Sequence, residues 1–233
     1  MKTILASMAR SLRGLHALIR PTGHSAGNPQ RRLNDLSGDR DVEWSWVAAN
    51  MPQGPGEAFE FGPGGSYLGL IAAQRDFDVT SVDLGPDRRP YVHPNLHFIQ
   101  GDVMKLDLHE GHYDLIINCS TVEHVGLAGR YGVVDSDPEG DLTAMHRLRA
   151  VMKPAGTMLM TVPVGRDAVF LPLHRVYGER RLPQLLRGFA VEKSRYWVKD
   201  EQNRWIMVDK PEALAREPQE RCYGLGCFVL RRA

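Results

Sequence analysis

The sequence has few cysteines, no long apolar run and almost no net charge. Three cysteines in 233 residues are too few for a disulfide framework, which favours a reduced, cytoplasmic protein. No stretch approaches the roughly 18 apolar residues that a transmembrane helix needs. Lys and Arg number 29 and Asp and Glu number 28, so the formal charge of +1 gives no indication of a nucleic-acid partner. A hydrophobic fraction of 42% is sufficient for one globular domain with a sizeable core.

Acidic side chains are also absent from residues 1–34, although this segment contains several Arg. Its apolar residues recur at helical spacing, so the sequence predicts a basic amphipathic helix that ends before Pro21. Such a helix can pack on the domain or on a partner subunit of a homodimer. Alternatively, residues 1–20 can make a weak contact with a membrane surface, which would hold the protein at the membrane periphery.

A second helix is expected over residues 39–51, because Pro52 stops the pattern. Trp44 and Trp46 cannot both lie on one side of this helix, so one is expected in the core while the other covers a ligand or a dimer contact. We therefore divide the chain into an N-terminal helical extension and connector, residues 1–52, and a main domain, residues 53–233.

A strand, a glycine turn and a helix are predicted in succession at the start of this domain. Residues 58–61 form a short apolar run that contains Glu60. Glycines then crowd around Pro63, and a helical pattern begins near Ser66. In this arrangement a ligand can approach bare backbone, and the acid beside the turn favours a cation or a ribose hydroxyl over a phosphate.

Polar residues stand at the ends of four predicted strands: Glu60, Asp83, Asp102 and Asn118. Because predicted strands alternate with helices, the sequence indicates an α/β fold with a doubly wound, mostly parallel sheet. Ligands bind at the carboxyl ends of the strands in such sheets. Asp83 lies 21 residues after Gly62, close to the spacing at which an acid meets a ribose in nucleotide-binding units.

Taken in order, these motifs resemble those of class I S-adenosylmethionine-dependent methyltransferases over about residues 57–165. The resemblance implies a Rossmann-like, seven-stranded, mostly parallel sheet and S-adenosyl-L-methionine as cofactor. Asp83 matches the acid that holds the ribose, Asp102 the acid that meets the adenine amino group, and residues 118–124 the segment beside the methionine part. The cofactor-binding residues that it implies are Glu60, Phe61, Gly62, Pro63, Gly64, Ser66, Asp83, Leu84, Asp102, Val103, Asn118, Cys119 and Ser120.

Two other functions stay open at this point. One is a nucleotide (NAD)-dependent oxidoreductase, although the dinucleotide fingerprint requires glycine where Tyr67 stands and Glu60 would repel a pyrophosphate. The other is a catalytically inactive binding module that keeps the fold without the chemistry.

The chemistry of methyl transfer to a hydroxyl calls for a base, and His124 is the predicted one, with Glu123 orienting it. Related enzymes hold a metal through Glu-x-x-Glu-His, but Ser120 occupies the first position here, so no metal is expected. The loop after the fifth major strand selects acceptors in this family, which makes its residues His174, Arg175 and Tyr177 candidate substrate ligands.

The segment that contains His124 is also similar to bacterial methyltransferase-like proteins associated with surface glycans. We therefore expect O-methylation of a sugar, glycoside or natural product in bacterial biosynthesis, with a small-molecule or glycan acceptor.

Overall fold

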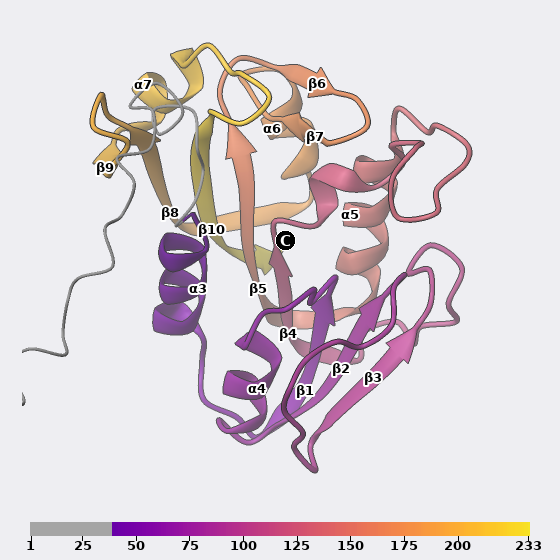
Figure 1. Cartoon of the computed structure of the whole chain (residues 1–233). Helices are drawn as coiled ribbons and strands as arrows, with labels where there is room; N and C mark the ends of the chain where they lie inside the picture. Colours follow the sequence, from indigo (N-terminus) through magenta and orange to yellow (C-terminus); the bar gives the residue numbers. More distant parts are fainter. Residues whose placement is uncertain (1–38) are drawn as a thin grey trace, which may run out of the picture. The chain divides into compact units, whose positions relative to one another are not determined.

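The computed structural model describes residues 39–233, which belong to one unit of the chain. The centre of this unit is one sheet with eight strands (Figure 1). Along the sheet the strands are β3 (Leu96–Gln100), β2 (Phe77–Asp83), β1 (Gly56–Phe61), β4 (Tyr113–Cys119), β5 (Met152–Val164), β10 (Gly224–Arg232), β8 (Phe189–Lys199) and β9 (Trp205–Val208). From β3 to β5 all neighbours are parallel, and the last three strands pair antiparallel.

The predicted α/β class and mostly parallel sheet are confirmed, but the predicted number of seven strands is wrong. The eighth strand, β9, is a four-residue strand at the sheet edge that pairs with the last residues of β8. Its neighbouring residues Ile206 and Met207 are both exposed, so β9 lacks the alternation of buried and exposed residues that marks a half-buried strand. Pairing with β8, rather than a local apolar pattern, defines this strand.

Helices cover both faces of the sheet, as a doubly wound fold requires. On one face lie α3 (Asp39–Asn50) and α4 (Leu68–Ala73), whose apolar residues share one core cluster with the strands. Helices α5 (Gly140–Val151), α6 (Arg181–Leu185) and α7 (Lys210–Ala215) contribute to a second cluster on the other face. The remaining elements are the 3₁₀ turn η1 (Val122–His124) and the small hairpin β6 (Ala168–Phe170) and β7 (His174–Val176).

The central strands are buried on both sides because their consecutive side chains face opposite helical layers. In β1, Ala58 belongs to the cluster under α3 and α4, and Phe59 belongs to the cluster under α5. In β4, Ile117 belongs to the cluster under α3 and α4, and Ile116 belongs to the cluster under α5. The continuous apolar runs read from the sequence therefore correspond to strands in the interior of the sheet.

The predicted second helix is confirmed as α3, which contacts α4, β4, β5 and β10. Trp46 is buried in the core, as expected for one of its two tryptophans. The predicted basic helix, its contact with a membrane and its role in a homodimer lie outside the described residues, and the division of the chain at residue 52 stays a prediction. Among residues 39–233, no helix is long and apolar enough to span a membrane.

Candidate active site

A cavity of about 820 Å³ opens where the parallel strands end, as the strand-end rule predicts. Residues that follow β1, β2, β3 and β4 all contribute to its lining. Of the residues singled out from the sequence, those that line the cavity are Glu60, Phe61, Gly62, Pro63, Gly64, Ser66, Asp83, Leu84, Asp102, Val103, Cys119, Ser120, Glu123, His124 and His174. Asn118, Arg175 and Tyr177 do not line it.

The glycine turn after β1 has a conformation and surroundings that demand glycine. Gly62 has a φ of +62°, and a Cβ atom placed on it would lie 2.3 Å from the Thr121 side chain. Gly64 also has a positive φ, but a Cβ placed on it or on Gly65 would meet no atom within 4 Å. The turn is therefore tight against the end of β4 on one side and presents open backbone to the cavity on the other.

Hydrogen bonds to Glu60 hold the glycine turn in place. Its carboxylate accepts hydrogen bonds from the Ser66 hydroxyl at 2.9 Å, the Gly69 amide at 3.0 Å and the Ser81 hydroxyl at 2.6 Å. Arg89, whose side chain is almost fully buried, forms an ion pair with it at 3.2 Å. Burial raises the pKa of Glu60 above its usual value, although Ser81, Ser66 and Arg89 oppose that shift. Because these contacts occupy both carboxylate oxygens, Glu60 fixes the shape of the glycine turn.

Two further carboxylates lie at the ends of neighbouring strands. Asp83, at the end of β2, accepts hydrogen bonds from the Gly85 amide at 2.9 Å and the Gly64 amide at 3.3 Å, so it connects its own loop to the glycine turn. Asp102, after β3, accepts from the Met104 amide at 2.9 Å. Carboxylate oxygens have several lone pairs, so both side chains retain capacity to accept bonds from the hydroxyl or amino groups of a nucleoside.

His124 is the last residue of η1, and its hydrogen bond shows which ring nitrogen carries the proton. Its Nδ1 atom lies 2.5 Å from the Leu173 carbonyl oxygen, an atom that can only accept, so Nδ1 carries the proton and Nε2 keeps its lone pair. Burial lowers the pKa of His124 to about 4, which keeps the ring neutral at pH 7. The Nε2 atom lies 3.7 Å from a carboxyl oxygen of Glu123.

Glu123 is buried, with 2% of its surface exposed, and its Oε2 atom has no hydrogen-bond partner in the described part of the chain. Burial raises the pKa of Glu123 to about 8, and the nearby charge of Glu43 adds to this shift. The carboxyl is therefore protonated at pH 7. His174 has a similar position: it lines the cavity, it is 7% exposed, and its Nε2 atom has no partner among residues 39–233.

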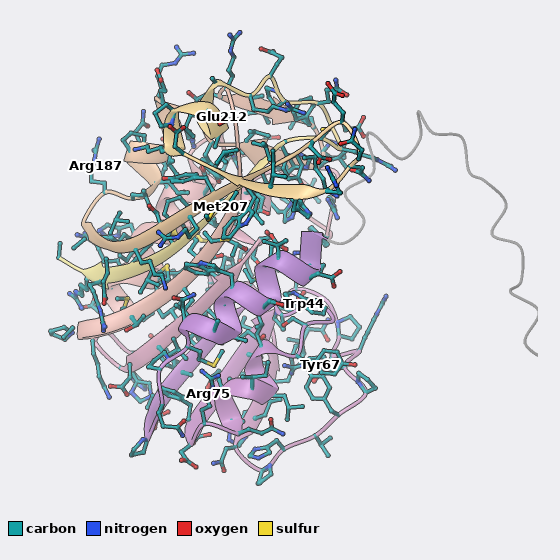
Figure 2. The ribbon with its side chains drawn as sticks, turned by 90° about the vertical axis from the view of Figure 1, so that its left-hand side faces the viewer. Trp44, Tyr67, Arg75, Arg187, Met207 and Glu212 are labelled. Carbon is teal, nitrogen blue, oxygen red and sulfur yellow. The ribbon has the colours of Figure 1, made fainter. Side chains whose placement is uncertain are left out.

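Several further residues line the cavity. Arg40 and Trp44 reach the cavity from α3, Arg130 and Tyr131 from the loop after η1, and Tyr223 from the segment before β10. Figure 2 shows Trp44 on α3 near Tyr67, and their rings meet edge to face at 6.3 Å. Trp44 is thus the tryptophan of this helix that lines the cavity, whereas the other residues become recognisable only when the chain is folded.

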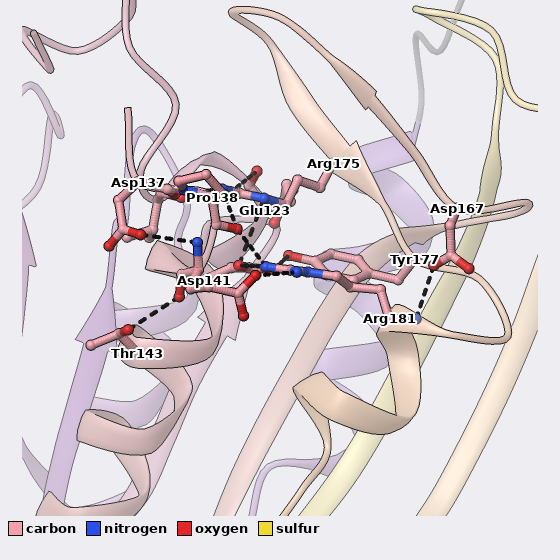
Figure 3. A network of polar contacts seen from close by, with 11 residues as sticks. Glu123, Asp137, Pro138, Asp141, Thr143, Asp167, Arg175, Tyr177 and Arg181 are labelled. Atoms are coloured by element: carbon pink, nitrogen blue, oxygen red, sulfur yellow. Dashed lines mark hydrogen bonds and ion pairs between the residues drawn. The ribbon is translucent and has the colours of Figure 1, made fainter. Parts of the chain in front are cut away.

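Arg175 and Tyr177 do not line the cavity but belong to a buried polar network (Figure 3). The Tyr177 hydroxyl donates to Asp141 at 3.1 Å, and the guanidinium of Arg175 donates to the carbonyls of Val125 and Asp137 at 2.5 and 3.0 Å. Asp141 is fully buried and forms ion pairs with Arg175 and with Arg181. Because Val125 and Asp137 line the cavity, this network holds the loop between η1 and α5 in place.

Asn118 is also fully buried, at the end of β4. Its side-chain oxygen accepts a hydrogen bond from the Val122 amide at 3.3 Å, and its nitrogen lies 3.5 Å from the Met145 sulfur. It thus shapes the turn into η1. Within residues 39–233, no group of three His, Cys, Asp or Glu side chains is placed to hold a metal ion.

Solved structures of other proteins share this fold. A methyltransferase from Burkholderia thailandensis that acts on 1,6-didemethyltoxoflavin, with S-adenosylhomocysteine bound, is 18% identical, with a TM-score of 0.60 over 98% of this chain and 90% of that one. The N-methyltransferase NodS from Bradyrhizobium japonicum, also with S-adenosylhomocysteine, is 14% identical, with a TM-score of 0.55 over 96% and 97%. The [4+2]-cyclase SpnF is 17% identical, with a TM-score of 0.59 over 85% and 83%.

The chain therefore has the fold of the class I S-adenosylmethionine-dependent methyltransferases. A family model described as "Caenorhabditis protein of unknown function, DUF268" matches residues 99–220, and the chain belongs to this family. A search of curated proteins by sequence finds no match.

Proposed function

We propose that this protein is an S-adenosylmethionine-dependent methyltransferase that methylates a hydroxyl group of a sugar, a glycoside or another small natural product. The observation that carries the proposal is the convergence of the glycine turn, two strand-end carboxylates and His124 on one cavity. The shared fold supports it, since related folds hold S-adenosylhomocysteine in the Burkholderia and Bradyrhizobium enzymes. The presence of a cyclase among the similar structures means that the fold alone does not define the reaction.

The cavity residues fit this cofactor. Open backbone at Gly64 and Gly65 leaves room for a bound molecule, where a Cβ would otherwise project. Asp83 would hold the ribose hydroxyls, and Asp102 with Val103 the adenine. The segment after β4, including Cys119 and Ser120, would lie beside the methionine part. When bound, S-adenosylmethionine supplies an electrophilic methyl group on a positively charged sulfur.

His124 is the proposed general base. Its Nε2 lone pair is available because Nδ1 is committed to the Leu173 carbonyl. His124 Nε2 would take the hydroxyl proton of the acceptor as the methyl group passes from the sulfur to the acceptor oxygen. The electron pair of the broken carbon–sulfur bond would stay on the sulfur, and neutral S-adenosylhomocysteine would leave. With a pKa of about 4, the imidazole is a weak base, so it takes the proton only after the developing bond has made the hydroxyl strongly acidic. The rest of the rate enhancement must then come from holding the reactants in line, which can supply about 7–11 kcal/mol.

The cofactor assignment is tested by titration calorimetry with S-adenosylhomocysteine and, separately, with NAD. Replacing Asp83 by asparagine removes a charged hydrogen-bond acceptor, so we expect S-adenosylhomocysteine to bind about 1.5–3 kcal/mol more weakly, roughly 10- to 150-fold. Asp78→Asn is the matched control, since Asp78 lies on the same strand, is 54% exposed and, within residues 39–233, bonds only His97. We expect that variant to bind like the wild type.

Other outcomes separate the alternatives. An unchanged affinity in Asp83→Asn removes Asp83 from the site, and binding of NAD in place of S-adenosylhomocysteine identifies an oxidoreductase. Incubation of the protein with cell extract and a donor labelled in its methyl group then tests the chemistry. Binding of S-adenosylhomocysteine without transfer of label to any extract component is the behaviour of an inactive binding module. A cytoplasmic location, favoured by the low cysteine count, is part of the proposal.

A further inference from the structure

Arg130 differs from the other basic side chains of the cavity in its partners. Lys and Arg residues that line the cavity are Arg40, Lys105 and Arg130. Arg40 forms an ion pair with Glu43 at 2.6 Å, and Lys105 forms one with Asp102 at 3.5 Å. Arg130 makes no ion pair in the described part of the chain: it donates from Nη1 to the Leu173 carbonyl at 3.2 Å and stacks on Tyr131, 4.5 Å from the ring centre. Most of its five N–H groups are thus available to a ligand.

The polar groups around Arg130 are also incompletely paired. Arg130 and His124 both donate to the Leu173 carbonyl, and Tyr131 lies beside both of them. Glu123 and His174 line the same cavity. Both are more than nine-tenths buried, yet Glu123 Oε2 and His174 Nε2 have no hydrogen-bond partner within residues 39–233. Buried polar atoms without partners are rare in folded proteins, and beside a cavity a bound ligand or water molecule can supply the missing partner.

The local charge at this part of the cavity is positive. Burial lowers the pKa of His124 and of His174 to about 4, and it raises the pKa of Glu123 to about 8, so all three side chains are neutral at pH 7. The nearby acids of the rim, Asp135 and Asp137, are exposed, and water screens their charge. Asp83 lines the cavity as well, but no ion pair joins Arg130 to any carboxylate within residues 39–233. Arg130 is therefore a cation without an ion-pair partner in this part of the chain, in a cavity that would also receive a positively charged sulfonium.

We propose that the acceptor molecule carries an oxyanion, a carboxylate or a phosphate, which accepts hydrogen bonds from Arg130 and from the ring N–H of His174. This inference rests on the proposed methyltransferase function and specifies its substrate class as an acidic or phosphorylated hydroxy compound, such as a sugar acid. A guanidinium matches the geometry of both oxyanions through two parallel hydrogen bonds. Its stacking on Tyr131 orients the planar group and leaves its edge for the ligand.

The experiment uses the full chain saturated with S-adenosylhomocysteine and three probes: inorganic phosphate, methyl β-glucuronide and the neutral methyl β-glucoside. Affinities are measured by ligand-observed NMR at two salt concentrations. We expect at least one oxyanion to bind about tenfold or more tightly than the glucoside, with an affinity that falls as salt rises. Whichever of phosphate and glucuronide binds more tightly identifies the anionic group.

Variants of Arg130 provide the decisive comparison. Arg130→Gln should lose the preference for the oxyanion by about tenfold or more, and Arg130→Lys should keep part of it, since lysine retains the charge without the planar fork. Arg180→Gln is the matched control, because Arg180 is 89% exposed and does not line the cavity. We expect it to behave like the wild type. Melting temperatures of all variants confirm that they are folded.

Binding of S-adenosylhomocysteine is measured first, which keeps the two hypotheses separate. A folded protein that does not bind S-adenosylhomocysteine defeats the proposed function itself. A protein that binds it, but binds neither oxyanion more tightly than the glucoside, refutes the Arg130 subsite and leaves the methyltransferase function standing. The subsite is also refuted if Arg130→Gln keeps the full preference of the wild type for the oxyanion.

Discussion

Replacing Glu123 by glutamine tests whether a buried, protonated carboxyl lies in the cavity at neutral pH. Glu123 is 2% exposed, one of its oxygens lacks a partner in the described residues, and burial raises its pKa to about 8. Glutamine has nearly the same shape and is uncharged at every pH. The substitution therefore preserves the state that Glu123 has at pH 6.5 and removes its titration above that pH.

The expected effect follows from the linkage between proton binding and folding. Between pH 4.5 and 8 the folded protein keeps a proton on Glu123 that the unfolded chain has released, so stability falls as pH rises, by at most about 1.4 kcal/mol per pH unit. His124 and His174 have lowered pKa values near 4, so they contribute in the opposite direction, but only between pH 4 and 6.5. Between pH 6.5 and 8, Glu123 accounts for a loss of about 2 kcal/mol, since one proton titrates over roughly 1.5 pH units.

The assay is urea unfolding at pH 6.5 and at pH 8.0 for the wild type, Glu123→Gln and Glu110→Gln. Glu110 is an exposed loop residue and serves as the control for loss of a carboxylate. We expect the free energy of unfolding to fall with pH in the wild type and in the control, and to fall about 2 kcal/mol less in Glu123→Gln. Burial also raises the pKa of Glu60, but Glu60 is present in all three proteins, so its contribution cancels when their stabilities are compared. Equal losses in the wild type and in Glu123→Gln would show that Glu123 titrates in its ordinary range.

Two further substitutions distinguish the proposed base, His124, from Tyr177, which belongs to the buried network outside the cavity. His124→Asn should leave the affinity for S-adenosylhomocysteine unchanged and lower the single-turnover rate by about 10²-fold or more, because an amide cannot accept the proton. A rate near that of the wild type would show that another residue is the base, with His174 as the next candidate. Tyr177→Phe should destabilise the protein by about 1–3 kcal/mol, because the buried Asp141 loses a hydrogen bond of 3.1 Å, while the affinity for S-adenosylhomocysteine stays the same. Chemical denaturation and calorimetry measure both quantities, and a loss of affinity without a loss of stability would place Tyr177 in the binding site.

The sequence alone determined the class of fold and one side of the cavity. Strands β1 and β4 are short and mostly apolar, and a glycine or a polar residue such as Asp83 or Asp102 stands at the end of a parallel strand or just after it. These are local signals, and the chirality of α/β units brings the carboxyl ends of parallel strands to one edge of the sheet. Hence residues far apart in the chain, from Glu60 to His124, could be assigned to one site before the fold was known.

Tertiary structure alone decided the rest. Arg130 and Tyr223 reach the cavity from loops without periodicity, Trp44 reaches it from a helix whose orientation the pattern left open, and β9 exists only as a partner of β8. Tyr177 was expected at the cavity, but its ring is fully buried and does not line it. The protonation of Glu123 likewise depends on burial, which arises from the packing of distant segments. Desolvation is a property of the folded surroundings and not of the residue, so no local pattern in the sequence can specify it.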